Sequence, residues 1–163
     1  MKRIRVGALI LCILAALYPV FVAEASRSEL PLELLPGPWQ GSYQCNQGLT
    51  RLSLAIRVEP SAPKGRVEAD FVFSPDPANP AVPVGSFLMA GKFDETTGLL
   101  ELKPVKWVVQ PVDPSYRMIE LEGRVRLAAD GTALIRGAIK NYGCKDFTLW
   151  QFYMDVPATS GGG

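Results

Sequence analysis

The stretch that decides the fold is Gly37–Cys45, which reads Gly-Pro-Trp-Gln-Gly-Ser-Tyr-Gln-Cys. Its large side chains, Trp39 and Tyr43, share one face with Cys45, and glutamines and a serine occupy the other face. Such a period of two is typical of a β-strand with one buried side. The segment therefore predicts a strand that opens the folded part of the chain.

Seven later segments repeat this alternation, and short turns rich in Gly, Asn and Asp separate most of them. The longer connection at 75–83 holds four prolines, which exclude a helix or an inner strand. We expect it to form a rim loop, or a stiff lip over the mouth of a cavity. The expected strands occupy residues 37–45, 51–59, 66–74, 84–93, 99–110, 116–127, 134–142 and 147–154.

This pattern indicates an all-β fold, because no stretch of helical period separates the strands as parallel βαβ units would require. Eight antiparallel strands close naturally into an up-and-down barrel, since closure removes the exposed edges of a sheet. A two-sheet β-sandwich is the alternative. The fifth strand would place Val105, Trp107 and Val109 on the inner face of the barrel.

The first 25 residues have the layout of a secretory signal peptide. Basic residues precede an apolar run at 6–22, and Ala23-Glu24-Ala25 forms an A-x-A cleavage site. We expect cleavage after Ala25 and a periplasmic or secreted protein without a membrane span. A retained anchor is the alternative, because the run is nearly long enough to cross a bilayer. The predicted organisation is a signal peptide (1–25), a lead-in arm (26–36), a β-barrel domain (37–156) and a disordered tail (157–163).

Two cysteines, Cys45 and Cys144, remain once Cys12 leaves with the leader. An even pair in an exported chain predicts a disulfide, which would fasten the first strand to the last hairpin. A metal site is one alternative, but it normally needs four Cys or His ligands, and the chain has no histidine. A redox-active pair is the other, but it normally has C-x-x-C spacing.

The lack of histidine also limits catalysis, because neither a Ser-His-Asp nor a Cys-His nucleophile can form. Paired acidic residues fall on outward positions or in turns, where solvation explains them. We therefore expect a protein that is not an enzyme and uses no metal or cofactor. The leader takes three of the 17 basic and one of the 16 acidic residues, which leaves 14 and 15, a balance that does not favour nucleic acid.

Gly37-Pro38-Trp39, near the start of a chain with eight expected strands, resembles the G-x-W motif of lipocalins and their calycin relatives. In that family the tryptophan packs across the closed end of the barrel, often under an arginine from a late strand. The periodicity places the candidates Arg124, Arg126 and Arg136 outward. The resemblance implies a barrel that holds a small apolar ligand. Tyr43-Gln44-Cys45 is similar to the Tyr-x-Cys of small exported inhibitors of c-type lysozyme, which implies an inhibitor that docks on another protein.

Two sets of residues are candidates for function. The first would line a site for a small apolar ligand inside the barrel: Trp39, Tyr43, Phe71, Phe73, Phe87, Met89 and Trp107. The second lies on the last expected strand, which is apolar on both faces, so that Trp150 and Phe152 point outward to a partner. Val108, Tyr116 and Met118 on neighbouring outer faces would extend that patch. The sequence thus predicts a binding module for a small apolar ligand or, alternatively, a protein that docks on another exported protein or on the cell envelope.

Overall fold

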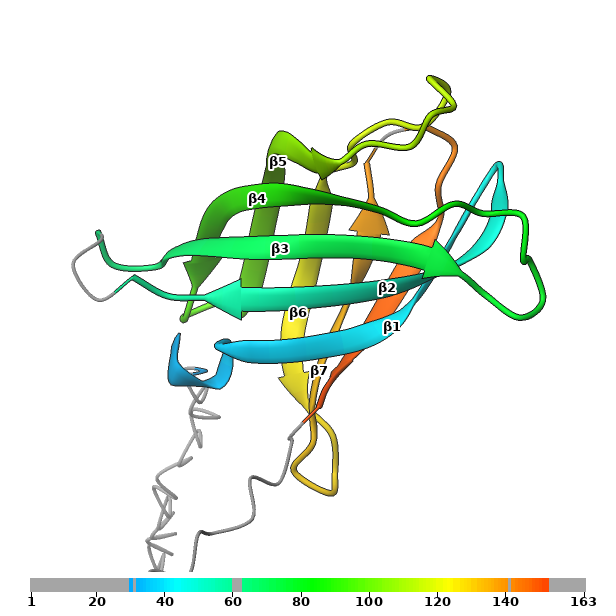
Figure 1. Cartoon of the computed structure of the whole chain (residues 1–163). Coiled ribbons are helices and arrows are strands. Elements are labelled where there is room, and N and C mark those ends of the chain that lie inside the picture. Colours follow the sequence, from blue (N-terminus) through cyan, green and yellow to red (C-terminus); the bar gives the residue numbers. More distant parts are fainter. Residues whose placement is uncertain (1–29, 31, 60–62, 141, 153–163) are drawn as a thin grey trace, which may run out of the picture.

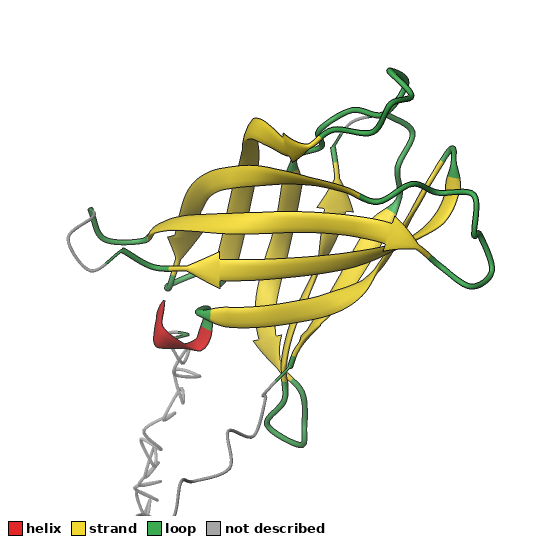
Figure 2. Cartoon of the chain, in the orientation of Figure 1, coloured by secondary structure: helices red, strands yellow, loops and turns green. Residues whose placement is uncertain are grey.

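The strands of the chain form one closed sheet (Figure 1, Figure 2). The structure, a computed structural model, describes residues 30, 32–59, 63–140 and 142–152. Within these ranges the chain forms a short 3-10 helix, η1 (Leu32–Leu34), and eight strands: β1 (Gly37–Cys45), β2 (Gly48–Arg57), β3 (Arg66–Pro75), β4 (Gly85–Asp94), β5 (Leu99–Val109), β6 (Leu121–Leu127), β7 (Ala133–Ile139) and β8 (Asp146–Gln151).

Each strand pairs in antiparallel fashion with the next one along the chain. The sheet closes because β1 also pairs with β8, from Trp39 opposite Gln151 to Tyr43 opposite Phe147. The predicted all-β, antiparallel up-and-down barrel is therefore confirmed, and the sandwich alternative is excluded.

The connections divide the barrel into two ends. The chain enters β1 at one end, where the turns after β2, β4 and β6 also lie; we call it the closed end. The connections after β1, β3, β5 and β7 lie at the opposite end, which we call the open end. A disulfide between Cys45 and Cys144 joins the end of β1 to the β7–β8 connection at the open end, which confirms the predicted pairing.

Residues of η1 and the segment after it cover the closed end. Leu35 is fully buried, and its carbonyl oxygen accepts a 2.9 Å hydrogen bond from the indole nitrogen of Trp39, which is also fully buried. The side-chain nitrogen of Gln151 donates to the carbonyl oxygens of Leu34 (2.9 Å) and Pro36 (3.2 Å). These bonds satisfy polar groups that burial removes from water. They hold residues 32–36, which we call the cap, against the closed end of the barrel.

Trp39 thus packs across the closed end, where the lipocalin resemblance places it, but no arginine covers it among the described residues. Arg124, Arg126 and Arg136 are exposed on the outer face, as the periodicity predicted. Arg124 donates instead to the carbonyl oxygen of Thr97 in the β4–β5 turn (2.7 Å).

Glycine occurs where neighbouring strands approach too closely for a side chain. A Cβ added to Gly41 in β1 would collide with the carbonyl oxygen of Thr148 in β8. A Cβ added to Gly91 in β4 would meet the carbonyl oxygen of Glu101 in β5 in the same way. The inner-face alternation of β1 therefore includes a small residue because the closure of the barrel against β8 requires it.

Strand β5 departs from the predicted alternation. Its register with β4 shifts at two points, so that Val105 and Val108 are each extra residues with no partner in β4. Each bulge changes which face the following residues occupy. Trp107 points inward as predicted, but Val105 and Val109 are exposed, so their predicted inner position is wrong.

Strand β6 is shorter than predicted. It begins at Leu121 instead of at residue 116, because the bulges carry the end of β5 along β4 and leave residues 116–120 without a strand to pair with. Strand β8 ends at Gln151, and residues 153–156 of the predicted barrel domain lie outside the described residues, as do the predicted leader and tail.

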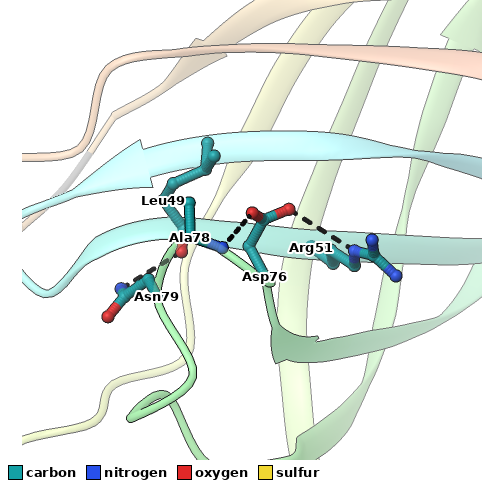
Figure 3. A network of polar contacts seen from close by, with 5 residues as sticks. All are labelled: Leu49, Arg51, Asp76, Ala78 and Asn79. Carbon is teal, nitrogen blue, oxygen red and sulfur yellow. Dashed lines mark hydrogen bonds and ion pairs between the residues drawn. The ribbon is translucent and has the colours of Figure 1, made fainter.

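The proline-rich β3–β4 connection is folded against β2. The carboxylate of Asp76 accepts a hydrogen bond from the backbone nitrogen of Ala78 (2.9 Å) and pairs with the guanidinium of Arg51 (3.4 Å), as Figure 3 shows. Val82 is buried. A connection held by its own turn, by an ion pair and by a buried side chain has a defined shape at the open end.

Candidate functional site

Aromatic rings gather inside the open half of the barrel. Phe71 stacks on Phe87 with ring centroids 4.4 Å apart, and Trp107 meets Phe87 edge-on at 5.3 Å. Phe73 stacks almost parallel to Tyr116 at 5.8 Å. Such pairs add stability beyond the area that they bury, about 0.5–1.5 kcal/mol each. Together these rings form an aromatic wall in this half of the interior.

A pocket of about 540 Å³ lies between this wall and the loops of the open end. Its floor is formed by aromatic side chains that are almost fully buried, and most of its exposed lining comes from polar residues of the open-end loops. The lining residues are Tyr43, Cys45, Asn46, Gln47, Phe71, Phe73, Phe87, Asp113, Ser115, Tyr116, Arg117, Ile119, Tyr142 and Cys144. The volume lies within the range of roughly 300–1,000 Å³ that is usual for small-molecule sites.

Tyr43 lines the pocket and is itself almost fully buried. Burial raises the pKa of Tyr43 well above its usual value, and a side-chain hydrogen bond with Thr50 offsets only part of that rise. The ring is 4% exposed and also contacts Phe71, with centroids 6.2 Å apart. The phenol therefore stays neutral throughout the physiological range, and the depth of the pocket carries no charge from this residue.

The rim of the pocket comes from loops that the fold holds in place. The β1–β2 turn contributes Asn46 and Gln47, and the β5–β6 connection contributes several residues between 113 and 117. The side-chain nitrogen of Asn79, in the β3–β4 connection, donates to the carbonyl oxygen of Gln47 (2.7 Å). It also donates to the carbonyl oxygen of Leu49 (3.2 Å), as Figure 3 shows. The proline-rich connection thus supports the rim from behind.

The charged residues of the rim lie in the β5–β6 connection. The carboxylate of Asp113 accepts a hydrogen bond from the backbone nitrogen of Ser115 (2.8 Å), and the hydrogen bonds with Ser115 lower the pKa of Asp113. Arg117 is exposed at the same rim. A ligand would therefore meet charged groups of both signs at the entrance, above the buried aromatic side chains of the floor.

Four of the predicted ligand-binding residues line this pocket: Tyr43, Phe71, Phe73 and Phe87. Trp107 lies behind the pocket, against Phe73 and Phe87. The pocket does not include Trp39, which lies at the closed end, or Met89, which is buried in the core. The inner face of a barrel runs its whole length, whereas the pocket occupies only the open end, and the sequence pattern does not distinguish the two.

Sequence reasoning missed the residues that the loops contribute, and Tyr116 is the most informative of them. We predicted that Tyr116 lies on the outer face of a strand, but it lines the pocket and stacks on Phe73. The prediction was wrong because residues 116–120 do not pair as a strand. Met118 was also predicted to lie on the outer face, but it is partly buried against the core. Val108 is exposed as expected.

The two predicted partner-facing residues lie on the surface. Trp150 is 46% exposed and Phe152 is 52% exposed. They border a shallow depression together with Gln40, Ser42 and Arg51. This surface lies outside the barrel and does not connect with the pocket residues.

The comparisons with known proteins assign no family. The sequence matches no family model and no curated protein. Among solved structures the chain is similar to a redesigned β-barrel, with 13% identical residues, a TM-score of 0.49 and a match that covers 78% of this chain and 96% of that chain. Within the described residues, no group of three or more His, Cys, Asp and Glu side chains is arranged to hold a metal ion. No helix in the same part of the chain is long and apolar enough to cross a membrane.

Proposed function

We propose that this protein binds a small, largely apolar molecule in the pocket at the open end of the barrel. The observation that carries the proposal is the pocket itself, which has a volume of about 540 Å³, buried aromatic side chains at its floor and a polar rim. Binding sites for small molecules combine such apolar walls with a few polar groups that fix orientation. The neutral hydroxyl of Tyr43 would be one of those groups.

The position of the pocket also supports binding. The closed half of the barrel is filled by buried side chains and sealed by Leu35 and Trp39. The open half leaves a volume that its own side chains do not fill. Eight-stranded barrels can either be packed solid or hold one small ligand. The closed end of this barrel is packed, and its open end has the pocket in which we propose that the ligand binds.

The test is a titration with N-phenyl-1-naphthylamine, a neutral probe whose fluorescence rises in apolar surroundings. We expect saturable binding to the protein and an increase of about tenfold in Kd for Phe73→Leu, because the substitution removes an aromatic wall of the pocket. Phe93→Leu is the matched control. Phe93 is buried to the same degree (4% exposed, against 3% for Phe73) but lies near the closed end.

The controls distinguish the outcomes. If Phe93→Leu weakens probe binding as much as Phe73→Leu does, the probe reports loosened packing and the pocket is not the site. If the folded protein shows no saturable binding of the probe, the proposed function is wrong.

The proposed place of action is an oxidising compartment, either the periplasm or the medium. The disulfide between Cys45 and Cys144 supports it, because disulfides persist mainly outside the reducing cytosol. Mass measurement of the protein from its own host tests the leader: a chain that begins at Ser26 supports export, and a chain that retains residues 1–25 contradicts the cleavage.

A second candidate function is docking on another exported protein or on the cell envelope. The exposure of Trp150 and Phe152 favours it, because large aromatic side chains on a surface are typical of contact sites. The test compares the wild type with a Trp150→Ser, Phe152→Ser double variant as bait for envelope extracts. A partner that the wild type retains and the variant loses supports docking, and equal retention contradicts it.

A further inference from the structure

Strand β5 separates from β6 halfway along its length. The two strands pair only from Leu99 opposite Arg124 to Leu102 opposite Leu121, whereas β5 remains paired with β4 up to Val109. Figure 1 shows β5 bending sharply near its label, beside β4. Within the described residues, the segment from Lys103 to Val109 therefore has a strand on one side only.

We call the side of this segment that pairs with no strand the β5 edge, and several side chains of the segment are exposed to solvent. Val105, Val108 and Val109 are 58%, 61% and 50% exposed. Lys103 and Lys106 are exposed as well. An exposed strand edge presents backbone donors and acceptors to which another extended chain can add.

The charge of the β5 edge restricts which kind of strand can pair with it. Between Leu102 and Val112 the sequence holds two lysines and no acidic residue. A second copy of this chain is a poor occupant, because antiparallel pairing of two such edges sets lysine against lysine, and like charges across strands are destabilising. Lysines at a sheet edge are also a device by which proteins prevent self-association.

An acidic strand, in contrast, would be attracted by the two lysines. We propose that the β5 edge binds an extended peptide segment of a partner protein, acidic and apolar in composition, by β-strand addition. Its backbone pairs with the free side of β5, its apolar side chains cover the exposed valines, and its carboxylates lie near Lys103 and Lys106. This site is separate from the pocket and from the surface around Trp150.

The test uses a synthetic peptide that alternates glutamate and valine, added to the purified protein. Amide hydrogen exchange at residues 105–110 is measured with and without the peptide. We expect exchange to slow by about tenfold or more at these residues and to stay unchanged in β1 and β8, because a paired backbone amide is protected from solvent. Protection that is absent from 105–110, or that spreads evenly over the protein, overturns the proposal.

A second peptide separates backbone pairing from charge attraction. It has the same sequence but carries an N-methyl group on every residue, which removes the backbone donors of both edges. Strand addition predicts that this peptide loses the protection. If both peptides protect residues 105–110 equally, the contact is electrostatic and the proposal is wrong.

The lysines are tested by a Lys103→Glu, Lys106→Glu double variant. The matched control is Arg136→Glu, Lys145→Glu, which changes the net charge equally at exposed positions on β7 and before β8. We expect the first variant to weaken peptide binding at least threefold, as the loss of two exposed charge pairs implies, and the control to leave it unchanged. Equal weakening by both variants, or protection of the edge by self-association without peptide, contradicts the assigned partner.

Discussion

The closed and open ends of this barrel are built from the same strands but in different ways. At the closed end, Leu35 and Trp39 are fully buried and hydrogen-bonded to each other, and Gln151 fastens the cap through two carbonyl oxygens. At the open end, the connections are held by the disulfide and by Asn79, and they surround a pocket.

This difference separates stability from binding. A filled and hydrogen-bonded end stabilises the fold, because core packing leaves few voids. The open end lacks part of that packing because of the pocket. Its rim is held instead by the disulfide and by the hydrogen bonds of Asn79. Substitutions at the two ends should therefore differ in kind, and pairs of matched variants test the division.

The largest expected effect comes from a pair of aromatic truncations. Trp39→Ala at the closed end should reduce the free energy of unfolding by about 3–5 kcal/mol, because it empties a packed site and orphans the Leu35 carbonyl. Tyr116→Ala at the open end should cost only about 1 kcal/mol, the value of one stacked pair. Urea denaturation followed by circular dichroism measures both. Equal losses would contradict the division between the ends.

Overpacking gives the next largest difference. Ile135→Phe in β7 should lower the free energy of unfolding by about 1–3 kcal/mol, because Ile135 is fully buried and has no room for a larger side chain. Ile119→Phe should be nearly neutral, since Ile119 borders the pocket and the ring can enter it. The same variant should reduce binding of N-phenyl-1-naphthylamine. A large loss of stability from Ile119→Phe would mean that the pocket is not available space.

Loss of the rim support should have a smaller effect on stability. Asn79→Ala removes two hydrogen bonds, one to Gln47 in the β1–β2 turn and one to Leu49 at the start of β2, and should lower the free energy of unfolding by about 1 kcal/mol while increasing the Kd for the probe. Asp130→Ala is the control, because it removes a comparable turn bond, to the nitrogen of Thr132, at the closed end. We expect the control to leave probe binding unchanged. If both variants change the Kd equally, Asn79→Ala weakens probe binding by lowering the overall stability and not by loosening the rim.

The smallest expected effect is a pH dependence of the cap. Hydrogen bonds from Lys64 and from the backbone nitrogen of Leu32 lower the pKa of Glu95. A carboxyl group with a lowered pKa in the folded state stabilises it above the pKa of the unfolded chain, and this contribution is lost as the pH falls below that value. The protection of the amides at residues 32–35 against hydrogen exchange should therefore decrease, relative to that of the barrel strands, when the pH falls from about 6 to 3. Glu95→Gln should remove that difference, and its persistence in the variant would assign it to other groups.

The strands could be predicted from the sequence because they follow from a local pattern, and the disulfide could be predicted because few cysteines are present. The alternation in β1 follows from the pleat of a strand, and two cysteines without other partners have one pairing. The start of β6 could not be predicted, since Tyr116 and Met118 alternate with their neighbours as a strand would. Only the bulges at Val105 and Val108 in the preceding strand remove their pairing partner, and a register shift leaves no periodic signal.

The candidate site was predictable in its walls and not in its rim. Phe71, Phe73 and Phe87 lie on inner positions of β3 and β4, which the alternation identifies directly. Asn46 and Ser115 belong to turns, where polar residues are common for reasons of backbone geometry alone. Nothing in their local sequence distinguishes a turn that faces a pocket from one that faces solvent.

The pairing of β1 with β8 has a consequence for how the chain acquires its structure. The contact between Trp39 and Gln151 spans nearly the whole folded region, so its formation must overcome the chain entropy of a very long segment. The ribosome must synthesise β8 before the barrel can close. Folding intermediates that lack β8 have unpaired strand edges at β1 and β7. A ribosome-bound chain that ends before residue 146 should therefore remain open and prone to aggregation until the last strand emerges.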